Sequence, residues 1–442
     1  MSASCRRSIA AAIALTTALV TCERAVPRAE LAGHLAALGH PNFVLIVVDT
    51  LRADWTTPYG DPRGASPELA RWAARGAVFE EVRSQSSWTK ISMASMMTSL
   101  WPHSHGLFEA RDALGEGAVT LAEKLHDAGY QCYAVQSNGW LDQSFGFQQG
   151  FDHYVFPRGT GAAKMAPSQL WPHADRVYEE AARLIEQRDP ARPMFLYLHF
   201  MDVHEYAAPP EFKKFGQDTP GAYLAAIRWD DDALARVRQK LDDAGLLDRT
   251  VMVFASDHGE AFGEHGKQGH ARNALTATLR TPLVIRFPFP ITPLRIKTQV
   301  RNVDIAPTLL ELAGVAVPEV FQGRSLLRLL TAEEVDQDRV TYAALGTPLY
   351  LDSSIQDSVS DGRWTYARNQ PKDRHPGEFL FDRSVDPGEN VNLIELEPVQ
   401  AARMRKLMDA QLLDEPSPGT RLRDVHIDPQ IADRLRAMGY LQ

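Results

Sequence analysis

The chain alternates short apolar runs with stretches in which apolar residues recur at helical spacing. Residues 42–49 read NFVLIVVD, and residues 194–200 and 281–287 read MFLYLHF and TPLVIRF. Unbroken apolar runs of this length are typical of strands that are buried on both faces of a parallel sheet. Helical stretches that end at Gly129 and Gly245 each lead into a further strand. The pattern predicts an α/β fold with a mostly parallel central sheet sandwiched by helices.

The pattern changes from about residue 335 onward. The segments RWTYARN and EFLFD and the turn DPGEN predict short antiparallel strands, and a helix is expected near residues 399–412. We therefore expect a large α/β domain over residues 41–330 and a smaller C-terminal α+β subdomain with an antiparallel sheet over residues 335–442. With 442 residues, of which 44% are hydrophobic and 23% charged, the chain is long enough for both.

The N-terminal residues 1–22 have the pattern of an export signal. Two arginines precede an apolar run that is shorter than the roughly 20 residues a membrane span needs. The final LVTC resembles the bacterial lipobox, which would be cleaved before Cys22 and lipidated there; a plain cleaved signal and an uncleaved anchor are the alternatives. We expect the cell envelope, as a periplasmic protein or a membrane-attached lipoprotein. Of the three cysteines, only Cys132 would remain as a free thiol in a lipidated mature chain, which excludes an intrachain disulfide.

Residues whose side chains could bind a metal or take part in catalysis follow three of the predicted strands. Asp49 closes the first strand, Asp202 and His204 follow MFLYLHF, and Asp257 and His258 follow VMVFAS. Each alone is typical of a turn or a helix cap. Because ligands of open parallel sheets bind beyond the carboxyl ends of the strands, the group together predicts a divalent-metal site at one sheet edge.

A glycine-rich loop, SDHGEAFGEHGKQGH, begins at the third of these strand ends. Its glycines permit a tight path that brings His258, His265, Lys267 and His270 close together; a surface loop without function is the alternative. The formal net charge of −9 argues against a nucleic-acid partner but leaves room for a locally basic pocket that binds an anion.

The segment SSWTKISMASMMTSLWPHSHG predicts a short helix that begins in a cluster of hydroxyls and stops at Pro102. Thr89 stands where this helix begins. Its hydroxyl is either an N-cap that accepts a hydrogen bond from a free backbone N–H, or a group with a chemical role.

These segments, with PNFVLIVVDTLRADWTTPYG, FLYLHFMDVHEYAAPP, VDIAPTLLELAG and QGRSLL in the same order, resemble the sulfatase family of the alkaline phosphatase superfamily over nearly all of the mature chain. The resemblance implies an alkaline phosphatase-like fold, a catalytic role for residues 41–330 and an anionic ester as substrate. It also exposes a departure. Typical sulfatases read CxPSRxxLLTG, and their Cys becomes a formylglycine; here Thr89 stands at the Cys position and Ser99 at the Gly. Thr89 cannot supply formylglycine, but phosphoethanolamine transferases and nucleotide pyrophosphatases of the same superfamily use a threonine there as a direct nucleophile.

The resemblance also implies the metal ligands, which are Asp49, Thr89, Asp257 and His258. Typical sulfatases have a second Asp beside the first, where this chain has Thr50. One carboxylate fewer and one imidazole more favour zinc or manganese over calcium or magnesium.

For the substrate, the resemblance aligns His204 with a histidine that contacts it. His270, or alternatively Lys267, aligns with the group that protonates the leaving oxygen. Asn138 falls in the segment where sulfatases keep a substrate-binding Lys.

Three functions remain open from the sequence. The favoured one is an exported metal-dependent hydrolase of sulfate or phosphate esters with Thr89 as nucleophile. The alternatives are a phosphoryl-group transferase of the phosphoethanolamine transferase type and a non-catalytic binding protein that keeps the fold.

Overall fold

The computed structural model describes residues 24–157, 172–331, 339–346, 357–369 and 377–437. The predicted signal segment 1–22, including Cys22, lies outside these ranges. Within them, no helix combines the length and the apolar character that a membrane crossing requires.

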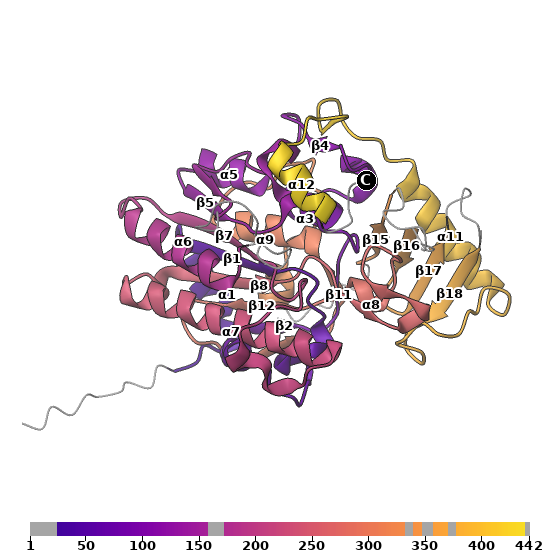
Figure 1. The fold of residues 1–442 in the computed structure, drawn as a ribbon, viewed down its shortest axis with the longest axis horizontal. Coiled ribbons are helices and arrows are strands. Elements are labelled where there is room, and N and C mark those ends of the chain that lie inside the picture. Colours follow the sequence, from indigo (N-terminus) through magenta and orange to yellow (C-terminus); the bar gives the residue numbers. More distant parts are fainter. Residues whose placement is uncertain (1–23, 158–171, 332–338, 347–356, 370–376, 438–442) are drawn as a thin grey trace, which may run out of the picture.

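The central sheet has eight strands in the order β13-β2-β12-β8-β1-β7-β5-β6 and lies in the middle of the molecule (Figure 1). Its strands are β13 (Leu294–Ile296), β2 (Ala77–Phe79), β12 (Leu283–Arg286), β8 (Thr250–Ala255), β1 (Asn42–Val48), β7 (Met194–Phe200), β5 (Gln131–Val135) and β6 (His153–Val155). The five strands from β8 to β6 run parallel, and β12 is antiparallel to both β8 and β2. The prediction of a mostly parallel sheet is confirmed.

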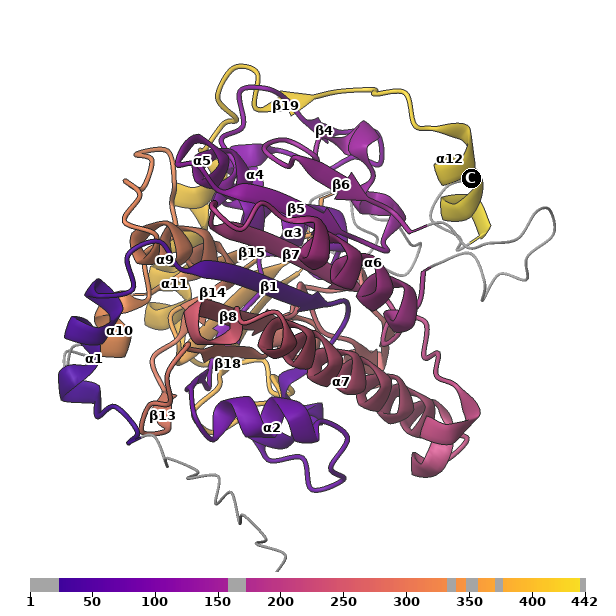
Figure 2. The same ribbon diagram turned by 90° about the vertical axis from the view of Figure 1, so that its left-hand side faces the viewer.

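Helices cover both faces of this sheet, and the side chains of β1 alternate between them. Phe43 and Leu45 belong to the core beneath α3 (Thr89–Thr98), α5 (Leu121–Asp127) and α9 (Ile305–Leu312). Val44 and Ile46 belong to the core beneath α2 (Pro67–Ala73), α6 (Ala174–Gln187) and α7 (Thr219–Asp243), the long helix in front of the sheet in Figure 2. Burial on both faces explains why the strand is apolar at every position.

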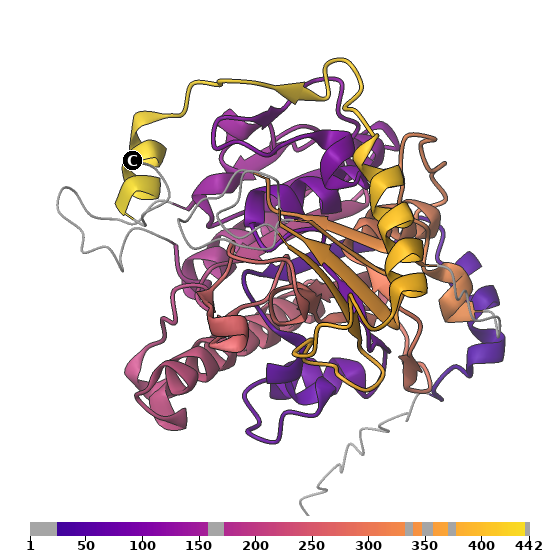
Figure 3. The same ribbon diagram turned by 90° about the vertical axis from the view of Figure 1, so that its right-hand side faces the viewer.

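A second, antiparallel sheet is built from β15 (Thr341–Ala344), β16 (Asp357–Ser360), β17 (Trp364–Arg368) and β18 (Glu378–Asp382). Helix α11 (Pro398–Leu412) packs on it through Met404 and Met408, which contact the apolar cluster around Tyr366 (Figure 3). The chain then returns, and α12 (Pro429–Ala437) places Ile431 and Leu435 in the core of the large sheet. The predicted antiparallel C-terminal sheet is confirmed, whereas the limits of the two domains stay a prediction.

The other elements are short and connect these layers. They are α1 (Arg28–Ala36), α4 (Pro102–His105), α8 (Thr276–Leu279), α10 (Leu327–Thr331), β3 (Val82–Arg83), β4 (Ala113–Leu114), β9 (Ala261–Phe262), β10 (Gln268–Gly269), β11 (Arg280–Thr281), β14 (Val300–Arg301) and β19 (Arg421–Leu422).

Candidate active site

Three neighbouring parallel strands bring Asp49, His199 and Asp257 to one point. Asp49 follows β1 and Asp257 follows β8, and the register places Val47 of β1 directly beside His199 of β7. All three side chains are fully buried, and each offers a ligand atom within 4.8 Å of the others. Buried carboxylates and an imidazole at such a distance form a group that can hold a metal ion.

The two oxygens of Asp49 have different surroundings. Oδ2 accepts hydrogen bonds from Asn138 Nδ2 at 2.7 Å, His199 Nε2 at 3.0 Å and the hydroxyl of Thr89 at 3.2 Å. Oδ1 is buried and has no hydrogen-bond partner among the described residues. Burial alone would raise the pKa of Asp49, but the His199 hydrogen bond and the charges of nearby histidines lower it well below its usual range.

The two oxygens of Asp257 also have different surroundings. Its Oδ1 accepts hydrogen bonds from the backbone N–H of His258 at 2.8 Å and of Thr50 at 3.2 Å, while Oδ2 is buried without a hydrogen-bond partner in the described part of the chain. Burial, reinforced by the charge of Asp49, raises the pKa of Asp257 to about 7. Each carboxylate therefore has one oxygen fixed by the protein and one oxygen left for another ligand.

Thr50 adopts a backbone conformation that a β-branched residue rarely takes. Its φ of +58° is in the left-handed region, and its hydroxyl donates to the carbonyl of Asp49 at 2.7 Å. Strain of this kind is retained where the surrounding structure requires it. Here the conformation aims the Thr50 N–H at Asp257, so the residue that stands in place of a second Asp positions a predicted ligand.

His258 presents an unprotonated nitrogen to the two free carboxylate oxygens. Its Nδ1 lies 3.0 Å from the carbonyl oxygen of Gly259, which can only accept, so Nδ1 carries the proton. The other nitrogen, Nε2, then carries a lone pair. It lies 3.7 Å from Asp49 Oδ1 and 3.5 Å from Asp257 Oδ2. Burial lowers the pKa of His258, which favours this neutral form. Two unsatisfied carboxylate oxygens and an imidazole lone pair are a donor set that fits a divalent cation.

The Thr89 hydroxyl faces this donor set and does not cap its helix. Helix α3 begins at Thr89 itself, its N-cap residue is Trp88, and no side chain makes a capping hydrogen bond. Besides donating to Asp49, Thr89 Oγ lies 3.3 Å from His258 Nε2 and accepts from Asn138 Nδ2 at 3.3 Å. Of the two sequence interpretations of Thr89, the N-cap is wrong.

Helix α3 ends at Thr98, and the residue that follows it is Ser99, at the position where typical sulfatases have glycine. Ser99 has a φ of +55°, which explains the preference for glycine there. Its hydroxyl donates to the carbonyl of Val303 at 2.8 Å and accepts from the N–H of Gly323 at 3.0 Å. These two hydrogen bonds hold the strained residue in place.

Two further histidines, His270 and His204, extend this group of polar side chains. The ring centroid of His270 lies 4.9 Å from that of His258 and 4.7 Å from that of His204. His204 Nδ1 pairs with Glu205 at 2.9 Å, and His270 Nδ1 pairs with Glu260 at 3.3 Å. Burial acts against protonation of both rings and lowers the pKa of His270, but Glu205 and Asp49 raise the pKa of His204 to about 9. A cationic imidazole therefore lies beside a neutral one.

Two residues named from the sequence have other contacts. The ring centroid of His265 lies 6.4 Å from that of Phe381 of β18, and His265 is exposed whereas His258 and His270 are buried. The expectation that His265 joins these two histidines stays a prediction. Asp202 instead pairs with His173 at 2.8 Å and accepts from the N–H of Ala174 at the start of α6.

Lys267 follows a short turn, Glu264–Gly266, and is half-buried. Its backbone N–H donates to Glu264, and its carbonyl accepts from Gly263. Its assignment as the alternative proton donor stays a prediction.

His199 was missed by the sequence analysis. It stands inside an otherwise apolar strand, where a lone histidine looks like a core residue. Its Nδ1 lies 2.8 Å from the hydroxyl of Tyr197, and its Nε2 donates to Asp49. The sequence held one sign of this role. His199 is one residue before the carboxyl end of its strand, and Asp49 directly follows the carboxyl end of another strand.

Comparison with known proteins identifies the family of this chain. The family model described as Sulfatase matches residues 41–315. The chain belongs to the sulfatase family. A second model, described as N-sulphoglucosamine sulphohydrolase, C-terminal, matches residues 263–416.

Among characterised sulfatases, the arylsulfatase A of Bos taurus is 26% identical over 462 residues, covering 86% of this chain and 90% of that protein. The steryl-sulfatase of Mus musculus is 29% identical over 273 residues. That alignment covers 53% of this chain and only 43% of the mouse protein, so the chain matches less than half of that relative's length.

Solved structures share the fold. A protein solved in complex with its substrate D-glucosamine-2-N,6-O-disulfate superposes with a TM-score of 0.71 at 18% identity, covering 85% of this chain and 99% of that one. The phosphonate monoester hydrolase of Agrobacterium radiobacter superposes with a TM-score of 0.69 at 17% identity, covering 87% and 99%. The sulfatase fold therefore accompanies proteins named for sulfate and for phosphonate chemistry.

Proposed function

We propose that this sulfatase is a metal-dependent hydrolase of phosphate and sulfate esters in which Thr89 is the nucleophile. The observation that carries the proposal is the position of Thr89 Oγ. The hydroxyl is the first side-chain oxygen of α3 and contacts Asp49, His258 and Asn138 without serving the helix as a cap. A hydroxyl at a helix N-terminus is also favourably placed toward an anionic group, because the helix dipole stabilises negative charge there.

Asp49, Asp257 and His258 are the residues that would hold the cation, with Thr89 completing the set and His199 supporting Asp49. Their mixture of oxygen and imidazole donors favours zinc or manganese, and calcium or magnesium are the alternatives. When bound, a divalent cation would supply positive charge that lowers the pKa of the Thr89 hydroxyl and offsets the charge of the ester. Thr89 would give its hydroxyl proton to water before it attacks.

The protein side chains then divide the reaction into two displacements. His270 is neutral in the free protein and takes up a proton when the anionic ester binds beside it and raises its pKa. Thr89 Oγ forms a bond to phosphorus, the bond from phosphorus to the leaving oxygen breaks, and that oxygen takes the proton from His270, or alternatively from Lys267. Cationic His204 and the amide of Asn138 bind and orient the anionic ester. A water molecule next attacks phosphorus as His270 removes its proton; the bond to Oγ breaks and inorganic phosphate leaves.

A threonine in place of formylglycine also favours phosphate esters over sulfate esters as substrates. A formylglycine hydrate releases sulfate by collapsing to its aldehyde, whereas a threonine ester has no such route and must be cleaved by an external nucleophile. Phosphoryl transfer through a hydroxyl ester suits this requirement. We therefore propose that phosphate monoesters or diesters turn over faster than sulfate esters.

The test is a substrate panel with metal analysis on the purified protein. Aryl phosphate, bis-aryl phosphate and aryl sulfate are compared in wild type, T89A and T89S. We expect phosphate turnover that T89A abolishes and that T89S, which keeps the hydroxyl, largely retains. Faster sulfate turnover would contradict the phosphate preference. Transfer of the phosphoryl group to an added alcohol in place of water would identify a transferase, and absence of all turnover in metal-loaded protein would identify a binding protein.

We further propose that the protein is held at the cell envelope by lipid on Cys22. The support is the sequence LVTC at the end of the apolar run. Palmitate labelling and detergent partitioning are expected for wild type and not for C22S. A soluble mature protein that begins at another residue would leave only an ordinary signal peptide.

A further inference from the structure

A cavity with a volume of about 570 Å³ lies at the end of the central sheet opposite to the candidate active site. It is bordered by Arg286 of β12, which is level with Met252 near the beginning of β8, whereas Asp257 follows the end of β8. Five residues of extended strand separate these two levels by about 16 Å. Its volume is within the range of small-molecule sites, so it is a separate candidate for ligand binding.

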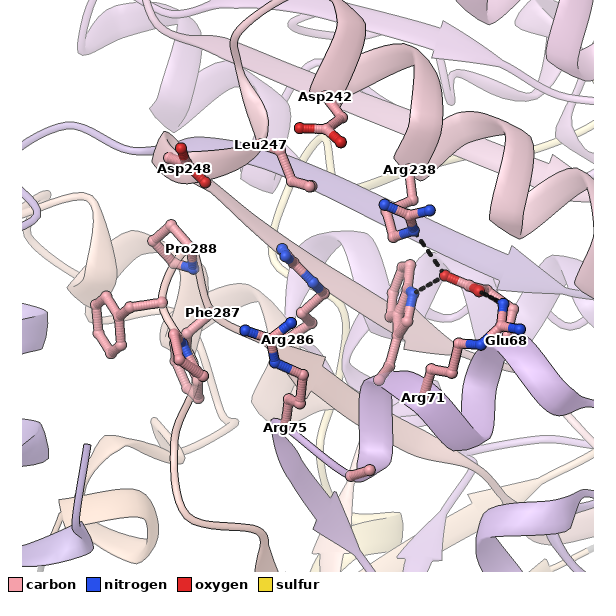
Figure 4. Close-up of a pocket in the computed structure, with 14 residues that line it drawn as sticks. Glu68, Arg71, Arg75, Arg238, Asp242, Leu247, Asp248, Arg286, Phe287 and Pro288 are labelled. Carbon is pink, nitrogen blue, oxygen red and sulfur yellow. Dashed lines mark hydrogen bonds and ion pairs between the residues drawn. The ribbon is translucent and has the colours of Figure 1, made fainter. Parts of the chain in front are cut away.

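Four arginines line this cavity, and two of them share one carboxylate of the protein (Figure 4). Arg71 and Arg238 both pair with Glu68, at 2.8 Å and 2.9 Å. Arg75 and Arg286 form no ion pair with a carboxylate in the part of the chain that the structure describes. Figure 4 shows their guanidinium groups next to each other, with Asp242 and Asp248 at the other end of the cavity.

Arg286 is only partly exposed, and its Nη1 is buried without a hydrogen-bond partner among the described residues. A buried guanidinium is normally fully hydrogen-bonded, because desolvating an unpaired charge is costly. Burial and the adjacent Arg75 and Arg238 lower the pKa of Arg286. Two neighbouring cations, one with an unsatisfied buried donor, form a site for an oxoanion, whose oxygens match the planar forks of arginine.

We propose that this cavity binds a phosphate group between Arg75 and Arg286. Apart from Glu68, Asp242 and Asp248, the rest of the wall is apolar and includes Trp72 and the segment from Phe287 to Pro290. The group that carries the phosphate therefore has an apolar surface to contact. The proposal is independent of the catalytic function, because none of the residues at the candidate active site lines the cavity.

The phosphate has two sources that the fold allows, a phosphate in solution and an anionic phospholipid headgroup. The rim of the cavity is joined to the N-terminal segment, since the N–H of Val26 donates to Pro290 at 2.8 Å and Val26 forms a bridge with Ile291. Cys22 precedes Val26 by four residues, which span at most about 14 Å. A lipid on Cys22 would therefore hold the cavity near the headgroups of a membrane.

The first arm of the test is calorimetric titration with inorganic phosphate of wild type, R75Q and R286Q. R423Q is the matched control, because Arg423 is exposed and does not line the cavity. Phosphate inhibition of turnover reports the active site separately. We expect one binding event to weaken at least tenfold in R75Q and R286Q, with unchanged inhibition and an unchanged R423Q. Arg75 is exposed, so R75Q remains informative even where R286Q fails to fold.

The second arm separates the two sources. Full-length protein carrying C22S, which has no lipid anchor, is sedimented with phosphatidylglycerol or phosphatidylcholine vesicles. Loss of phosphatidylglycerol binding on adding R75Q supports the headgroup as source; loss of phosphate binding alone supports a soluble phosphate. The proposal is overturned when R75Q and R286Q bind both phosphate and vesicles as tightly as R423Q does.

Discussion

Replacing Thr89 with valine separates the chemical role of its hydroxyl from any structural role. Valine keeps the β-branch and nearly the same volume, and it replaces the hydroxyl group with a methyl group. The hydroxyl makes three contacts of 3.2 to 3.3 Å and no capping hydrogen bond. Contacts of this length contribute about 1 kcal/mol to folding at most. Loss of a nucleophile, by contrast, lowers turnover on the order of 10³-fold or more, which is about 4 kcal/mol in activation free energy.

Thr98→Val is the matched control. It is the same substitution in the same buried helix, and Thr98 Oγ donates to the carbonyl of Ala94 at 2.6 Å, away from the site. Turnover of aryl phosphate and the urea unfolding free energy are measured for both variants. We expect similar losses of stability and a loss of turnover only in T89V. If T89V retains turnover within tenfold of T98V, Thr89 is not the nucleophile.

Two other predictions follow from the same geometry, and a third concerns Asp231 of α7, a buried carboxylate that accepts hydrogen bonds from the N–H groups of Glu68 and Leu69 at 2.8 and 2.9 Å. D257N should lose bound metal and turnover together, as read by elemental analysis and kinetics; full metal content in D257N would remove Asp257 from the site. H199A should weaken metal affinity by roughly tenfold to a hundredfold, since His199 Nε2 fixes Asp49 Oδ2 at 3.0 Å, and an unchanged affinity would make the contact incidental. Burial raises the pKa of Asp231 to about 7, so the folded state binds more protons than the unfolded state between pH 4 and 7. The stabilising effect of Asp231 relative to D231N should therefore fall as pH rises through this window in urea titrations; a difference that is constant or grows would contradict the burial argument.

The strands could be predicted because burial on both faces leaves a sequence signature. Every residue of β1 and β7 is buried, and their apolar runs were visible without the structure. The same signature concealed His199, because a polar residue within an apolar run carries no mark of which neighbour it meets. Its function depends on the register between β1 and β7, and register is a property of the folded sheet.

The sequence predicted that the polar residues at the strand ends lie together, but not the direction in which each side chain points. Asp49 and Asp257 meet because β1 and β8 are adjacent, whereas Asp202 turns away to His173. Sequence spacing also placed Thr89 at a helix start without showing which way its hydroxyl points. That direction depends on Asp49 and Asn138, which are 40 and 49 residues away in the chain.

A covalent bond between phosphorus and Thr89 Oγ is the intermediate that the proposed reaction requires. Metal-loaded wild type is mixed with an aryl phosphate, quenched with acid before one turnover is complete, digested and mapped by mass spectrometry. We predict a single phosphoryl group on the peptide that contains Thr89, formed at the rate of leaving-group release and absent from T89V. Release of the leaving group without a phosphoryl group on Thr89 at any quench time, or with one on another residue, would contradict the account.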